Sequence, residues 1–252
     1  MSALSIALIV LLCCLTAGLI GLMLHRVVPE HHLNADSKDT VKLVMGLIAT
    51  ISGLVLGLLI ASAKSSYDAQ VASEQQVAAD LIQFDQQLAR FGPETKEVRV
   101  QLLKDVSRVH ALVWASGGAG GTLDPMVSAR EWDAIYSGVQ DLVPRTAAQH
   151  DNQARALEIG STIGRRRLLQ FVAITNPIPL PFLIVLVLWV VMLFLGFGLF
   201  AQFNLTVMVS LSVGALSIAA AIFLILELNS PYSGLLRISD APIQYALSRI
   251  SQ

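Results

Sequence analysis

Histidine and carboxylate side chains gather in one short stretch between two long apolar runs. The stretch holds His25, Arg26, Glu30, His31, His32, Asp36 and Asp39. Imidazole and carboxylate groups bind metal ions, and histidine also changes its charge near neutral pH. The spacing matches no zinc motif, and the composition is that of a solvated loop, so the sequence predicts no metal site. A metal-binding or pH-responsive role for His25, His31 and His32 stays open.

The remaining titratable side chains form no recognisable catalytic set. His110 and His150 are isolated in the sequence, and His110 lies beside Val109 in a predicted helix, which is typical of a structural histidine. The glycine-rich run 117–121 lacks the preceding strand and following Lys that a phosphate-binding loop needs. We therefore expect neither an enzyme nor a bound cofactor.

The composition is that of a membrane protein. Hydrophobic residues make up 54% of the 252 residues and charged residues 14%, with a net charge of −1 and a mean hydropathy of +0.65. A typical soluble domain has about 25% charged residues. Four apolar runs are long enough to cross a bilayer: residues 3–24, 41–63, 182–203 and 205–226. Nothing in the charge balance favours nucleic acid as a partner.

These runs predict an all-α membrane protein with four transmembrane helices per subunit and a helical cytoplasmic bundle formed partly by their extensions. The expected parts are a hairpin at 1–63, a helical segment at 64–176, a second hairpin at 177–228 and a tail at 229–252. The segment at 64–176 carries 12 Lys and Arg residues and the tail 2, against 3 in the loop between the first two spans. The positive-inside rule then places both termini in the cytoplasm.

The second apolar run predicts the longest helix, from Val41 to about Phe91, because no Pro or Gly follows Lys64 before Gly92. Such a helix would be about 75 Å long at ~1.5 Å per residue. Its small residues include Gly46, Ser52, Gly53, Gly57 and Ala61, and the three glycines fall near one helical face. With Thr50, the glycines Gly46, Gly53 and Gly57 form the candidate set. Two interpretations stay open for these residues, a groove for close helix packing and the lining of a narrow pore.

Beyond the membrane the same helix carries an apolar seam with steps of four and three. Its members are Val77, Leu81, Phe84, Leu88 and Phe91. Extended toward the membrane, the seam turns polar at Glu74, Gln70 and Tyr67, which are candidates for lining a water-filled vestibule. Residues 64–91 have a local charge of −2, and an acidic mouth attracts cations rather than anions.

Further helices are expected in the cytoplasmic segment. Gly92-Pro93 starts one that reaches about Ala115, Ser128 and Glu131 form a capping box that opens another, and a third covers about residues 146–175. Arg165, Arg166 and Arg167 in the third would contact lipid headgroups. In the tail, Asp240–Ile250 is amphipathic and suits either the membrane surface or the bundle.

The most specific stretch of the chain is Leu226–Ser239, at the end of the fourth span. Its turn contains Glu227, Pro231, Tyr232 and Gly234. The stretch resembles the carboxyl-terminal signature of a mostly bacterial family of membrane proteins, of unknown function, labelled bestrophin-like, and the Pro-rich entry 177–181 fits as well. Asn229-Ser230 and Tyr232 stand where Asp-Arg and Phe would be expected.

The resemblance implies a relationship to bestrophins, which are pentameric anion channels. No bestrophin pore motif is present to carry over, and the acidic calcium-binding run of animal bestrophins is not apparent. We therefore predict a homo-oligomeric membrane ion channel, in the first instance a pentamer, that is lined by the second span and passes small ions of undetermined sign. The alternative is a non-conducting membrane scaffold or sensor whose cytoplasmic bundle binds a partner.

Overall fold

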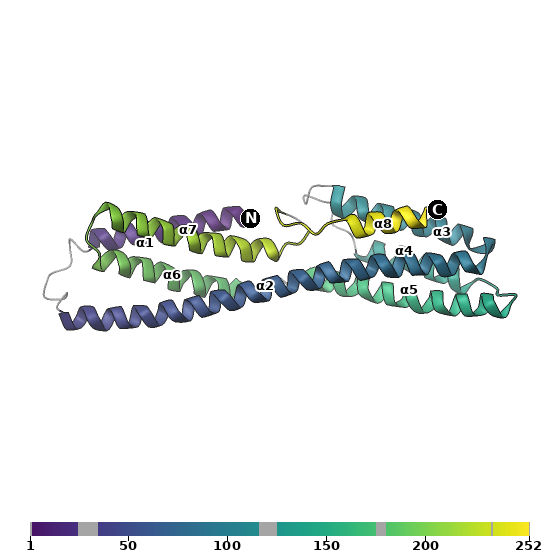
Figure 1. Ribbon diagram of the computed structural model, residues 1–252, viewed down its shortest axis with the longest axis horizontal. Helices are drawn as coiled ribbons and strands as arrows, with labels where there is room; N and C mark the ends of the chain where they lie inside the picture. The colour runs from purple at the N-terminus through teal and green to yellow at the C-terminus, as the bar shows by residue number, and fades with distance from the viewer. Residues whose placement is uncertain (1, 25–34, 116–124, 175–179, 233, 252) are drawn as a thin grey trace. The chain divides into compact units, whose positions relative to one another are not determined.

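The computed structural model describes residues 2–24, 35–115, 125–174, 180–232 and 234–251, and all regular structure in these ranges is helical (Figure 1). Four helices are long and apolar enough to cross a membrane. The predicted all-α class with four spans is therefore confirmed. The chain divides into two compact units, Met1–Ser66 with Pro177–Asn229, and Tyr67–Asn176 with Ser230–Gln252. We call them the membrane unit and the helical unit.

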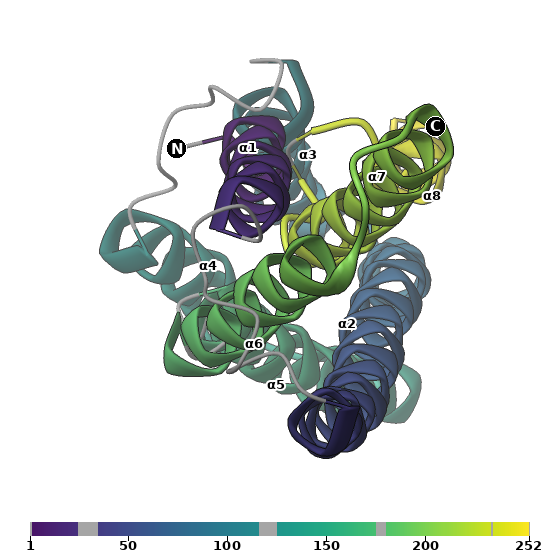
Figure 2. The same ribbon diagram turned by 90° about the vertical axis from the view of Figure 1, so that its left-hand side faces the viewer.

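The membrane unit contains α1 (Ala3–Leu24), the first part of α2 (Ala35–Phe91), α6 (Leu180–Phe200) and α7 (Leu205–Leu228). Helices α1, α6 and α7 are neighbours (Figure 2) and share one apolar core. Its fully buried members include Cys14 of α1, Leu186 of α6 and Ile222 of α7. A short turn joins α6 to α7, where the Asn204 side chain accepts a hydrogen bond from the backbone N–H of Val207 at 2.8 Å and caps α7.

Helices α1 and α6 touch through their backbones. A Cβ atom at Gly21 would lie 2.8 Å from the backbone nitrogen of Leu199, and one at Gly198 would lie 2.9 Å from the backbone nitrogen of Leu22. Real Cβ atoms do not come this close to a backbone atom, so both positions require glycine. Small residues of this kind allow membrane helices to pack closely.

The helical unit contains the rest of α2, the short 3₁₀ turn η2 (Pro93–Thr95), α3 (Lys96–His110), the π-helical turn η3 (Ala111–Ala115), α4 (Pro125–Gln140), α5 (Ala147–Ile174) and α8 (Ala241–Ile250). Gly92 has a φ of 134° and ends α2. The Thr95 hydroxyl then donates to the carbonyl of Leu88 at 2.8 Å, which fixes the reversal of the chain.

The core of this unit confirms the predicted seam of α2. Val77, Leu81, Phe84, Leu88 and Phe91 are all buried. Ile243, Ala246 and Ile250 of α8 belong to the same core, so the amphipathic end of the tail packs on the bundle, one of its two predicted places.

Two local predictions are wrong. Helix α4 begins at Pro125, so Ser128 lies within its first turn and cannot be the N-cap, and Glu131 pairs with Arg108 instead of closing a capping box. Helix α2 begins at Ala35, so Asp36 and Asp39 lie in a helix and not in a loop. His25, Arg26, Glu30, His31 and His32 lie outside the described residues.

Candidate functional site

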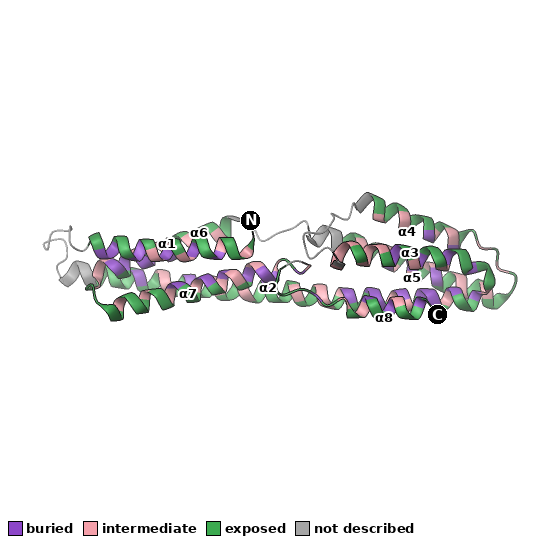
Figure 3. Ribbon diagram, turned by 90° about the horizontal axis from the view of Figure 1, so that it is seen from above, coloured by how far each residue is buried: buried purple, intermediate pink, exposed green. Residues whose placement is uncertain are grey.

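The membrane part of α2 presents a face that no described residue of the chain covers. Exposed residues also run along α1, α6 and α7 (Figure 3). Only 6% of its most apolar window is buried, against 22–39% for the other three spans. The exposed side chains include Leu43, Leu47, Thr50, Leu54 and Leu58. The opposite side carries the buried Met45 and Ser52. Helix α2 therefore packs on its unit along one edge and leaves the remainder to the bilayer or to another molecule.

The glycines of α2 belong to this uncovered side. A Cβ atom at Gly46, Gly53 or Gly57 would meet no atom within 4 Å. Within one chain these glycines therefore form no tight contact, unlike Gly21 and Gly198. Thr50 is exposed beside them, with its hydroxyl donating to the carbonyl of Gly46 at 2.9 Å. A pore-lining or intermolecular role for the four residues stays a prediction.

A shallow apolar pocket of about 320 Å³ lies where α2 meets α6. The pocket is lined by Lys42, Met45, Gly46 and Ala49 from α2, and by Gly196, Phe197, Phe200 and Ala201 on the other side. The Lys42 ammonium is 3.8 Å from the carboxylate of Asp39. Gly46 thus lines the edge of the contact between α2 and α6.

The three predicted vestibule residues lie on the packed side of α2. Glu74 is 7% exposed, and its Oε1 accepts a hydrogen bond from the Tyr232 hydroxyl at 2.5 Å. Tyr67 and Gln70 are half-buried. Exposed side chains nearby on α2 include Gln75 and Gln83, which the sequence pattern did not single out. A lining role for Tyr67, Gln70 and Glu74 stays a prediction.

Asp80 and Asp85 of α2 have counterions on other helices. The guanidinium of Arg99 bonds Asp85 through Nε at 2.7 Å and Nη2 at 2.9 Å, and Arg166 lies 3.0 Å from Asp80. The hydrogen bond to Asp85 raises the pKa of Arg99. A bidentate arginine cancels the charge of its carboxylate. The local charge of −2 along residues 64–91 therefore does not describe the folded helix, and it no longer argues against an anion.

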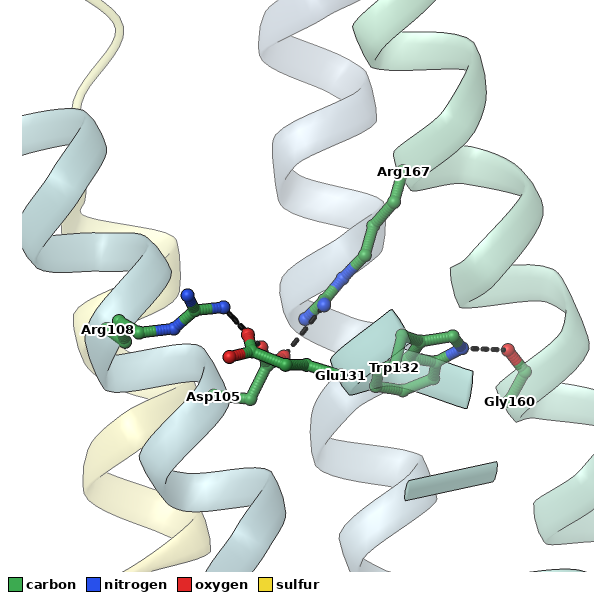
Figure 4. A network of polar contacts seen from close by, with 6 residues as sticks. All are labelled: Asp105, Arg108, Glu131, Trp132, Gly160 and Arg167. Atoms are coloured by element: carbon green, nitrogen blue, oxygen red, sulfur yellow. Dashed lines mark hydrogen bonds and ion pairs between the residues drawn. The ribbon is translucent and has the colours of Figure 1, made fainter. Parts of the chain in front are cut away.

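A second arginine lies deep in the helical unit (Figure 4). Arg167 Nη1 donates to Asp105 Oδ2 at 2.7 Å, and its guanidinium carbon lies 4.5 Å from the centre of the Trp132 ring. Trp132 Nε1 donates to the carbonyl of Gly160 at 3.1 Å, and Arg108 bridges Asp105 and Glu131. Helices α3, α4 and α5 thus share one charge cluster around the buried Asp105.

The predicted lipid-contact triplet is consequently divided. Arg166 binds Asp80 and also Gln76, and Arg167 is enclosed by Asp105 and Trp132. Arg165 is exposed. Contact with lipid headgroups stays a prediction for the triplet. Among the three arginines, only the side chain of Arg165 is exposed.

The four predicted turn residues are divided between the units, with Glu227 in the membrane unit and Pro231, Tyr232 and Gly234 in the helical unit. Glu227 is buried in the last turn of α7. Pro231 is buried, and its carbonyl accepts the backbone N–H of Ile238 at 2.9 Å, while Gly234 has a φ of 87° that only glycine adopts without strain. Tyr232 reaches Glu74, as described above.

Two aromatic side chains from α3 and η3 complete the contacts of this turn. Trp114 Nε1 donates to the carbonyl of Ile238 at 3.0 Å, and its ring meets that of Tyr232 edge-on at 5.9 Å. His110 stacks on Trp114, and its Nε2 lies 2.9 Å from Asp240 Oδ2. His110 is isolated in the sequence, but Asp240, its partner in the fold, lies 130 residues away, and this contact agrees with the predicted structural histidine. No sequence signal linked them.

Among the described residues, no three His, Cys, Asp or Glu side chains come together as a metal site. The chain is a multi-pass, all-helical membrane protein with a second, helical unit outside its spans. A family model described as the Bestrophin-like domain matches residues 10–243. The chain therefore belongs to the Bestrophin-like family, as the turn after the fourth span predicted.

Solved structures show the same fold. A point variant of the bacterial bestrophin homolog from Klebsiella pneumoniae aligns with a TM-score of 0.70 at 12% identity, over 99% of this chain and 97% of that one. Another crystal structure of that homolog aligns at 0.68 with 10% identity over 96% of both chains. A variant of a membrane protein aligns at 0.64 with 10% identity, over 98% and 97%. No curated protein matches the sequence.

Proposed function

We propose that the chain is one subunit of a homo-oligomeric ion channel of bestrophin-like architecture, with the membrane part of α2 lining the pore. The uncovered face of this helix carries the proposal. Glycine in a helix interior is about 1 kcal/mol less favourable than alanine. Contact with lipid does not offset this cost, whereas close packing between copies of α2 around an axis does, because the glycines permit close approach.

The properties of this face suit a narrow apolar passage. No ionisable side chain lies between Leu43 and Ala63, so ions there would meet the hydroxyl groups of Thr50 and Ser62 and otherwise apolar groups. Hydrophobic constrictions of this kind gate conduction by dewetting. Because bestrophins are pentamers, we propose that the channel has five subunits. Both termini are proposed to be cytoplasmic, in the inner membrane of a bacterium, and the sign of the ion is left to measurement.

The first test is electrical. Purified protein reconstituted in planar bilayers should pass current, with a reversal potential that reports the favoured ion when the two sides differ in salt. If no current is measured under any voltage or ionic gradient, the proposal that the protein is a channel is wrong. A stoichiometric partner recovered from native membranes would then support the scaffold or sensor.

Replacing Leu54 with serine tests which helix lines the pore. Leu54 is 64% exposed next to Gly53, and a hydroxyl there would hold water in a constriction. We expect a several-fold rise in single-channel conductance or open fraction. Leu188→Ser on the exposed face of α6 is the matched control and should leave the current unchanged. If Leu54→Ser and Leu188→Ser change the current equally, α2 does not line the pore.

A further inference from the structure

A second row of regularly spaced side chains runs along the part of α2 that belongs to the helical unit. Its members follow one another in steps of three and four residues: Ala69, Ala72, Gln76, Ala79, Gln83 and Gln86. This spacing places them on one face of the helix. All six are exposed, whereas the members of the seam that starts at Val77 are buried. We call this row the amide seam.

The composition of the amide seam differs from that of an ordinary solvent-facing surface. None of its six members is charged over a length of about 26 Å at ~1.5 Å per residue. The solvated face of a surface helix usually carries charged residues. On α3, for example, three of the six exposed residues are charged: Lys96, Glu97 and Lys104. Charged residues are depleted where two protein surfaces meet, so the seam has the character of a covered surface.

The carboxylates of the same stretch are directed to other helices of the unit. Asp85 is bonded to Arg99 at 2.7 Å, Asp80 lies 3.0 Å from Arg166, and Glu74 accepts the hydroxyl of Tyr232. The only exposed charges that adjoin the amide seam at its N-terminal end, those of Lys64 and Asp68, have opposite signs.

The rotation of α2 about its own axis is fixed by the buried seam. Phe84 is fully buried in the core of the helical unit and Leu81 is 1% exposed. Gln76 is held as well, because its Oε1 accepts a hydrogen bond from Arg166 Nη1 of α5. The amide seam is therefore held on the outside of the unit, where only another molecule can cover it.

We propose that the amide seam faces the same seam of the other copies around the axis of the oligomer and lines a water-filled vestibule below the pore. The inference rests on the proposed function, in which the membrane part of α2 lines the passage. Counted back along α2 in steps of three and four, the series reaches Ser65, Leu58 and Leu54. The exposed leucines and the amide seam thus follow one periodicity.

Amide side chains would give this vestibule a defined chemistry. A glutamine amide donates and accepts hydrogen bonds, so it keeps water and hydrated ions beside it, but it carries no charge. Selectivity for the sign of an ion comes from charged rings or oriented dipoles in the pathway. The vestibule would therefore stay wet where the leucines above it favour dewetting, and it would pass small ions of either sign.

A charge introduced into the amide seam should then set the favoured ion. We expect Gln83→Lys to raise the anion-to-cation permeability ratio severalfold and Gln83→Glu to lower it severalfold, read from reversal potentials in planar bilayers. Recording at or below 0.1 M salt keeps the Debye length at about 10 Å or more. Gln101→Lys and Gln101→Glu on α3 are the matched controls, because Gln101 is also an exposed glutamine, and they should leave the ratio unchanged.

Cross-linking tests the same placement without any current. Gln83→Cys in the full-length protein in lipid nanodiscs should be joined to other copies by a short, water-soluble bis-maleimide, and Gln101→Cys should not. Cys13 and Cys14 lie in the apolar helix α1, and the parent protein with these two cysteines is the blank. The products are measured as covalent dimers and larger species on denaturing gels.

The outcomes separate the amide seam from the channel. If the parent conducts and both charged variants of Gln83 keep its reversal potential, the seam does not line the pathway, although the channel stands. Equal cross-linking of Gln83→Cys and Gln101→Cys also contradicts the proposal. If the protein passes no current but Gln83→Cys alone is cross-linked, the copies meet at the seam and only the channel is wrong.

Discussion

Replacing Asp105 with alanine is expected to destabilise the helical unit by about 3–5 kcal/mol. The Asp105 side chain is 3% exposed and binds Arg167, which is 17% exposed, at 2.7 Å. Removing one member of a buried ion pair leaves the charge of the other without its hydrogen-bonded partner, here Arg167 without Asp105. A lowering of the thermal midpoint by about 10 °C, followed by tryptophan fluorescence, would be the signature.

Two further variants separate the charge from other effects of the substitution. Asp133→Ala on the exposed side of α4 should change stability by no more than about 0.5 kcal/mol. Asp105→Leu together with Arg167→Met removes both charges and should recover part of the loss, since an apolar pair of similar volume often replaces a buried ion pair without cost. Equal melting of Asp105→Ala and Asp133→Ala would show that the cluster contributes nothing.

The helices could be predicted because their causes are local. Apolar runs of bilayer length, the Gly92-Pro93 break and the four-three spacing from Val77 each act within a few turns of chain. The tail helix followed from the same periodicity, and its contact with the bundle was one of two predicted places. The capping box failed because Pro125 starts α4 one turn earlier, which leaves Ser128 inside the helix.

The polar contacts could not be predicted, because their members are far apart in the sequence. Arg167 and Asp105 are 62 residues apart, and Tyr232 and Glu74 are 158 apart. A charge summed along α2 alone counted Asp80 and Asp85 without Arg166 and Arg99, which come from α5 and α3. With these arginines counted, the sum gives no argument for a cation-attracting mouth.

The vestibule prediction shows a related effect. Tyr67, Gln70 and Glu74 continue the spacing of a buried seam, so they keep its direction and point toward the packed side of α2. A polar residue on such a seam indicates a partner from another element more readily than it indicates water. For Glu74 that partner is Tyr232, and the family signature in the turn is therefore also a tertiary contact.

Replacing Gly21 with alanine should disrupt the membrane unit more than any glycine substitution in α2. The added methyl group would overlap the carbonyl of Leu195 and lie 2.8 Å from the nitrogen of Leu199, and neither backbone atom can rotate away. Overpacking costs about 1–3 kcal/mol where side chains can yield, and more is expected here because backbones must separate. We expect a lower thermal midpoint in detergent and less folded protein in the membrane fraction.

Gly53→Ala is the matched control, because its new Cβ meets nothing within 4 Å and alanine favours the helix. In the single chain it should be neutral or slightly stabilising. Gly198→Ala should resemble Gly21→Ala, and the two together should cost less than their sum, since both act by separating the same pair of helices. If Gly21→Ala melts with the parent while Gly53→Ala does not, the tight contact in the assembled protein lies along α2 and not between α1 and α6.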